Sequence, residues 1–142
     1  MTRDAEILQA FFDTVWSGGD AAAVRRYFAP DAFATGLVGG MELNAEDMVS
    51  FVQALAMHAS EIEVRVDHVI SDGRWVSALV RSTATSRRTG RTLTLSGQTL
   101  VRFEGELIAE AYNHFDMLGL FMQMGLLPEN AMERLLAGLH AD

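Results

Sequence analysis

The sequence contains no cysteine. That absence excludes disulfide bonds, thiol nucleophiles and thiolate metal sites, and with them a structural zinc centre. No apolar run approaches the roughly 18 residues that a membrane-spanning helix needs. The charged N-terminus, Met1-Thr-Arg-Asp-Ala-Glu6, leads directly into an amphipathic pattern and does not have the form of a signal peptide. A cytoplasmic location is therefore the default expectation.

Basic residues are also scarce, since 11 Lys and Arg stand against 19 Asp and Glu and give a formal charge of −8. An acidic surface repels backbone phosphates, so nucleic acids and anionic membranes are not expected partners. Arg87, Arg88 and Arg91 form a local exception that is typical of a solvated hairpin tip. At 142 residues and 49% apolar, the chain is expected to form one domain over residues 1–142, without a linker.

The first third of the chain has helical periodicity. Apolar residues spaced one and then three apart predict a helix over residues 4–17, which Gly18-Gly19 ends. Asp20 can cap a second short helix through about residue 28, and Pro30 prevents its continuation. A short strand is predicted over residues 31–37. Asn44, followed by acidic residues, then predicts the start of a third helix.

From Glu61 the period of the apolar residues changes from 3.6 to 2. Ile62, Val64, Val66 and Ile70 predict a half-buried strand, and the Asp72-Gly73 turn leads to further strands over residues 75–86, 92–103 and 107–115. A C-terminal helix follows Pro128, and its apolar face is predicted to comprise Met132, Leu135, Leu136 and Leu139. Helices that cover one face of a strongly bent antiparallel meander make an α+β fold.

The last strand runs into a short apolar helix, and several polar residues lie at their junction. Alternation along the strand places on one face Glu110, Tyr112, His114 and Asp116, and on the other Ala111, Asn113 and Phe115. If the first face looks into the interior, an acid, an imidazole and a phenol share one wall, which suits proton transfer. In the alternative interpretation the two acids lie near the rim and the histidine makes an ordinary hydrogen bond.

This order of elements resembles the nuclear transport factor 2-like (NTF2-like, cystatin-like) superfamily over the whole chain. Within it, the stretch Glu110-Ala-Tyr-Asn-His-Phe-Asp116-x-Leu-Gly-Leu-x-x-Gln123-x-Gly125 is similar to the SnoaL-like polyketide cyclase group. The resemblance implies an open cone with a hydrophobic pocket, a homodimer formed through the convex sheet face, and ring closure by an intramolecular aldol reaction. It implies no metal and no organic cofactor. Asp116 matches the acid of the motif, and Tyr112 stands where a tryptophan is usual.

These considerations give a candidate site. Asp116 is the expected base and His114, placed by alternation alone, the expected helper that holds its charge or polarises a carbonyl. The candidate hydrogen-bond donors to an oxyanion are Gln98 and Tyr112, and the candidate apolar lining comprises Trp16, Phe33, Met48, Phe51, Met117 and Phe121. No third His or Glu stands at a spacing that would complete a metal site with His114 and Asp116.

Two departures from relatives leave alternatives open. Thr35-Gly36 stands where several relatives carry a histidine or a base aspartate, and Arg102-Phe-Glu104 is the nearest equivalent of the Arg-x-Asp pair of limonene epoxide hydrolase-like members. The sequence therefore supports two hypotheses. One is a cofactor-independent, polyketide cyclase-like enzyme acting on an apolar or aromatic carbonyl compound. The other is a non-catalytic ligand-binding or interaction module with the same cone.

Overall fold

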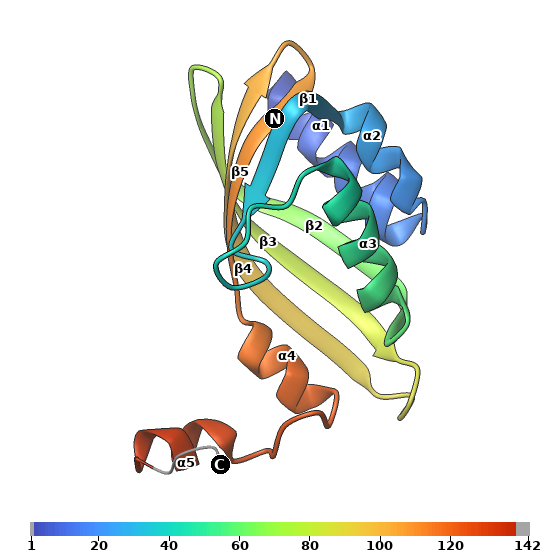
Figure 1. Cartoon of the computed structure of the whole chain (residues 1–142), viewed down its shortest axis with the longest axis vertical. Helices are drawn as coiled ribbons and strands as arrows, with labels where there is room; N and C mark the ends of the chain where they lie inside the picture. The colour runs from blue at the N-terminus through green and yellow to red at the C-terminus, as the bar shows by residue number, and fades with distance from the viewer. Residues whose placement is uncertain (1, 139–142) are drawn as a thin grey trace.

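The computed structural model describes residues 2–138, and its N-terminal helices cover one face of a five-stranded sheet (Figure 1). The helical elements are α1 (Arg3–Phe11), the π-helical turn η1 (Phe12–Ser17), the 3₁₀ turn η2 (Ala21–Ala23), α2 (Val24–Tyr27), α3 (Ala45–Ala56), α4 (Met117–Gln123) and α5 (Ala131–Leu136). The strands are β1 (Phe28–Thr35), β2 (Ala59–Asp72), β3 (Trp75–Ser86), β4 (Thr92–Glu104) and β5 (Leu107–Phe115).

The predicted helix starts are confirmed by their capping contacts. The Asp20 carboxylate accepts a hydrogen bond from the Ala23 N–H at the start of η2. At the start of α3, Asn44 and Asp47 form a reciprocal capping box, in which each side chain accepts the other residue's backbone N–H. These contacts satisfy donors that have no partner within the helix, which is why the chain turns helical at these residues.

The sheet has the order β1-β5-β4-β3-β2, in which β2 to β5 form the predicted antiparallel meander and β1 pairs parallel to β5. The α+β fold is confirmed. The first strand begins earlier than the predicted 31–37, because residues 28–35 pair with β5 and Gly36, at φ +84°, turns the chain away. Pro30 is tolerated there because β1 is an edge strand whose pairing is irregular between Phe28 and Phe33.

Two irregularities bend β2. The register with β3 shifts between Ser60 and Glu63 and again between Asp67 and Ile70, and each shift contains a residue with positive φ, Glu61 at 52° and His68 at 46°. An extra residue in one strand bends it and reverses the alternation beyond it. The prediction that Ile70 is buried is therefore wrong: its side chain is 72% exposed, and Val69 packs against the core instead.

The core lies between the inner face of the sheet, which is the face toward the helices, and the helices themselves. Its largest fully buried side chains include Leu8 of α1, Phe103 of β4 and Ile108 of β5. The C-terminal helix α5 forms after Pro128, but it lies away from this core, at the end of the molecule opposite α1 and α2 (Figure 1). Its apolar residues Met132, Leu135 and Leu136 are exposed, and Leu139 lies outside the described residues.

Candidate functional site

A cavity of about 120 Å³ lies between the inner face of the sheet and the helices. Its aromatic lining comprises Phe11, Phe12, Trp16, Phe28, Phe51 and Phe115. Aliphatic side chains from all five strands complete most of the wall, with Ala34 contributed by β1. Of the described residues that line the cavity, none is an acid, a base, a histidine or a tyrosine. The site is therefore suited to an uncharged, mainly apolar molecule, because a charge would lose its hydration there without gaining a partner.

The register of β4 and β5 decides which side chains enter the cavity. Val101 and Thr99 of β4 point inward beside Ala111 and Asn113 of β5, which are their respective cross-strand partners. Phe115, two residues further along β5, also lines the cavity. The inner face of β5 is thus the face that carries Asn113.

Asn113 and Thr99 form a buried polar pair within this apolar wall. They are 7% and 2% exposed, and the Thr99 hydroxyl donates to Asn113 Oδ1 at 2.8 Å. Asn113 Nδ2 in turn donates to the backbone carbonyl of Thr35 at 3.1 Å, which ties β5 to the end of β1. The sequence-based interpretation missed Asn113 as a site residue. The signal was available, because its same-face neighbours Ala111 and Phe115 are apolar, whereas the residues of the opposite face are all polar or ionisable.

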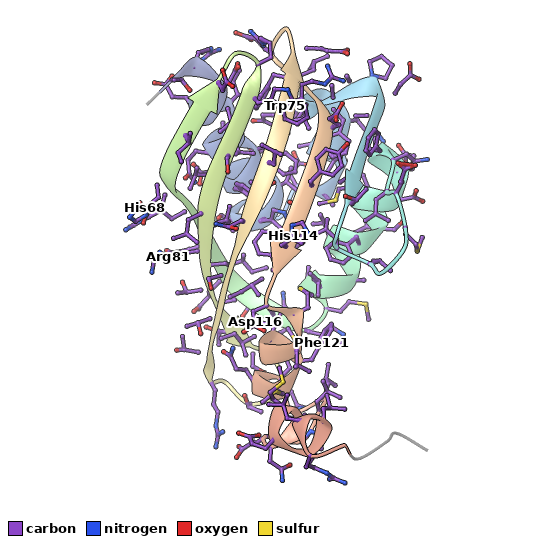
Figure 2. All side chains as sticks on the ribbon, turned by 90° about the vertical axis from the view of Figure 1, so that its left-hand side faces the viewer. His68, Trp75, Arg81, His114, Asp116 and Phe121 are labelled. Atoms are coloured by element: carbon purple, nitrogen blue, oxygen red, sulfur yellow. The ribbon has the colours of Figure 1, made fainter. Side chains whose placement is uncertain are left out.

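The residues expected on the inner face of β5 lie on the outer face, which Figure 2 shows toward the viewer with His114 labelled. Tyr112 and Glu110 form a hydrogen-bonded group there, since the Glu110 carboxylate accepts from the Tyr112 hydroxyl and from Arg102 Nε, both at 2.8 Å. Arg102, and then Tyr112, hold the pKa of Glu110 below its ordinary value, and the carboxylate raises the pKa of the Tyr112 phenol. The expected placement of His114 and Tyr112 inside the cone is therefore wrong.

Three further candidate residues also lie outside the cavity, two of them because of the strand register. Gln98 is the cross-strand partner of His114 on the outer face and is exposed. Phe33 packs edge-on against the Tyr112 ring on the same face, with ring centroids 6.0 Å apart. Phe121 packs against a second cluster around Leu93 and Leu120 and does not line the cavity. The candidates that do line it are Trp16, Met48, Phe51 and Met117.

Asp116 is exposed and caps α4, rather than facing the cavity. Its carboxylate accepts the N–H of Gly119 at 2.9 Å, the N-cap contact expected of an aspartate where a strand passes directly into a helix. The Gly119 backbone lies so close to this carboxylate that a side chain at position 119 would overlap it. The structure therefore corrects the expected position of Asp116 and gives it a structural contact.

The rest of the motif also holds α4 in place. The side-chain amide of Gln123 pairs with the backbone of Thr94, and Arg88 Nη2 donates to the Met124 carbonyl at 2.9 Å. Gly125, at φ +76°, follows the helix, and a side chain there would collide with Arg88. Because Met117, Leu120 and Met124 line the cavity, these contacts fix the wall of the cavity at the end where β5 stops.

The alternative site around Arg102 is not formed in the cavity either. Arg102 contacts Glu104 at 3.1 Å and Glu110 at 2.8 Å on the outer face, and Asp116 is absent from this group. Within residues 2–138, no three His, Cys, Asp or Glu side chains come close enough together to hold a metal ion. The same residues include no helix that is both long and apolar enough to cross a membrane.

A known family profile matches most of this chain. The profile of the SnoaL-like domain matches residues 8–111, which include the second half of α1, the other helices that cover the sheet and most of the sheet. The chain belongs to the SnoaL-like family. The matched region ends at Ala111, before the motif around Asp116, so the structural roles given above to that motif rest on its contacts alone. No match was found among curated proteins.

Solved structures of other SnoaL-like and NTF2-like proteins share the fold. A candidate polyketide cyclase from Acidithiobacillus ferrooxidans superposes with a TM-score of 0.76 at 26% identity, over 88% of this chain and 96% of that one. IdmH, a candidate polyketide cyclase from Streptomyces antibioticus, gives 0.76 at 18% identity, over 87% and 99% of the two chains. AclR, a candidate hydroxylase from Streptomyces galilaeus, gives 0.74 at 17% identity, over 88% and 97%. The different names attached to one fold mean that the reaction cannot be transferred from the fold alone.

Proposed function

We propose that this SnoaL-like protein binds a neutral, mainly apolar molecule of about one aromatic ring in its cavity. The observation that carries the proposal is the lining, in which no described side chain is ionisable and six are aromatic. An apolar cavity of comparable size, about 150 Å³, is known to accept benzene in another protein. Burial of apolar ligand surface supplies the affinity, and the aromatic side chains supply shape.

Binding can be tested with α-methylstyrene as an apolar probe and benzoate as a charged probe of similar shape. We expect α-methylstyrene to raise the melting temperature saturably, since a ligand that binds only the folded state stabilises it by mass action. It should also shift the indole N–H signal of Trp16, which lines the cavity, and leave that of Trp75, on the outer face, unchanged. Benzoate should bind at least about 100-fold more weakly.

Neighbouring residues of β3 provide a matched pair of variants. Ser82 lines the cavity, whereas Thr83 points to the exposed outer face. Ser82→Phe should fill the cavity and abolish the response to α-methylstyrene, and Thr83→Phe should retain it. The proposal fails if wild type gives no saturable response, or if Ser82→Phe responds as wild type does.

A polyketide cyclase-type reaction is the second candidate, favoured by the relatives of this fold that carry that name. In that hypothesis Asp116 transfers the proton, without metal or organic cofactor, and the expected helper His114 takes no part because it lies on the outer face of β5. Asp116 stands between Phe115 and Met117, which both line the cavity. Asp116→Asn keeps a capping side chain but removes the acid. Loss of turnover of an aromatic polyketide-like substrate, with binding unchanged, would support catalysis by Asp116; equal turnover would exclude it.

We also propose that two copies pair through the outer face of the sheet. An outer aromatic patch lies there, in which Tyr112 contacts Phe33 and stacks on Trp75 at 6.4 Å, next to Leu100, which is 40% exposed (Figure 2 labels Trp75). Light scattering should give a dimer for wild type and a monomer for Leu100→Lys. Gln53→Lys, on an exposed position of α3, is the control that should remain dimeric. A monomeric wild type at micromolar concentration would refute the pairing.

A further inference from the structure

The wall of the apolar cavity contains a buried, hydrogen-bonded polar pair, Thr99 and Asn113, that the proposed binding function leaves unexplained. The buried polar residues of the described chain are Ser86, Thr99 and Asn113, and two of these three are cross-strand partners in the cavity wall. Replacing such a pair by apolar side chains of the same shape is nearly neutral for stability, so packing does not require it. A polar pair in an otherwise apolar pocket usually fixes the orientation of a ligand.

The hydrogen bonds of the pair define which groups it can offer. The backbone carbonyl of Thr35 can only accept, so the NH₂ of the Asn113 amide must face it, and Oδ1 must face Thr99. The Thr99 hydroxyl therefore donates its hydrogen to Asn113 and has none left to donate to a ligand. Asn113 Nδ2 has a second N–H, to which the hydrogen bonds of residues 2–138 assign no protein acceptor. One amide donor is thus available from a side chain that is 7% exposed.

The local backbone holds this donor in position. Gly36, which follows Thr35, lies so close to the Asn113 backbone carbonyl that a side chain there would overlap it. This close approach sets the Thr35 carbonyl beside the Asn113 amide, and Thr99 fixes the other end of the amide at 2.8 Å. A donor held by two partners is pre-organised, so binding to it costs little additional ordering.

We propose that Asn113 selects ligands that carry a neutral oxygen acceptor, such as a ketone, ester or hydroxyl oxygen, on an apolar body. The inference rests on the proposed binding function and names the ligand class for the same cavity. A carboxylate would also accept the bond, but no described lining residue carries the positive charge needed to compensate it. An oxygen-free hydrocarbon would enter the cavity and leave the donor without an acceptor. Thr99 acts through Asn113, as a positioning residue.

The test compares acetophenone with α-methylstyrene, which has the same shape but a methylene group in place of the carbonyl oxygen. The readout is the ratio of the two dissociation constants, in wild type and in Asn113→Leu. We expect the substitution to shift this ratio against acetophenone by about fivefold or more, the value of one net hydrogen bond. Ser86→Ala, which alters a buried polar residue outside the lining, should leave the ratio unchanged.

A second measurement uses wild type alone and does not depend on whether Asn113→Leu folds. The chain has three asparagines and four glutamines, so its side-chain amide signals can be resolved by NMR. Acetophenone should shift the Asn113 Nδ2 protons, α-methylstyrene should shift them much less, and the Gln98 amide on the outer face should not respond. If both compounds bind and neither the ratio nor the Asn113 signal distinguishes them, this inference is refuted and the binding function stands. If neither compound binds, the binding function itself fails.

Discussion

The side-chain amide of Gln123 pairs with the backbone of Thr94 at both ends, Oε1 accepting the N–H and Nε2 donating to the carbonyl, each at 2.8 Å. Gln123 thus imitates one residue of a neighbouring strand along the edge of β4, beyond the point where β5 ends. The contact joins the last turn of α4 to the sheet, and α4 contributes part of the cavity wall.

We predict that Gln123→Ala loosens α4. Losing both hydrogen bonds should lower the free energy of opening of this segment by about 1–3 kcal/mol, because Thr94 loses its only described side-chain partners. Hydrogen exchange should show faster exchange at residues 117–124 and little change in α3. Gln53→Ala, at an exposed position, is the matched control. Unchanged protection of α4 would mean that Leu120 and Met124 hold the helix without Gln123.

We predict that Asp116→Ala destabilises the protein by about 1 kcal/mol, the usual cost of removing an N-cap side chain. Asp116→Asn should cost much less, since an asparagine oxygen accepts the same Gly119 N–H. Urea unfolding of the two variants measures the difference. Equal stability of Asp116→Ala and wild type would show that the cap contributes nothing in solution.

We predict that Gly36→Ala is among the costly single substitutions, at about 2 kcal/mol or more. The residue has φ +84°, and an added side chain would overlap the Asn113 backbone carbonyl. Gly39→Ala is the control, because nothing lies within 4 Å of a side chain built there. Thermal unfolding should separate the two clearly. Gly36→Ala protein that remains folded should also lose the preference for acetophenone, since Gly36 sets the approach of β1 to Asn113.

We predict that Glu110→Gln changes how stability depends on pH. The pKa of Glu110 is lowered on folding, so its stabilising contribution is present above the unfolded value of about 4.3 and is lost as pH falls through the lower folded value. Glu110→Gln should therefore be less stable than wild type at pH 7, and the difference should shrink on acidification. Urea titrations between pH 3 and pH 7 measure it. Glu129→Gln, at an exposed position, should show no such convergence.

The sequence determined the elements of this fold, because each is specified by short-range chemistry. The Asn44 capping box, the Asp20 cap and the Asp72-Gly73 turn act within a few residues, and the elements predicted from them are confirmed. The order of these elements resembles the NTF2-like superfamily and the stretch 110–125 resembles the SnoaL-like group, and the matching domain profile confirms the SnoaL-like family.

Only the tertiary structure decided the site. Alternation along β5 separates Asn113 from His114, and the apolar neighbours Ala111 and Phe115 indicate that the Asn113 face is the buried one. Only the packed structure shows that Thr99 and the Thr35 carbonyl lie beside the Asn113 amide. The bulge at His68, which exposes Ile70, depends on pairing with β3 and leaves no mark in the local pattern. Asp116 satisfies a proton-transfer motif and a helix cap equally well by sequence. The packing of α4 assigned it to the cap, because the Asp116 carboxylate accepts the Gly119 N–H and the residue does not line the cavity.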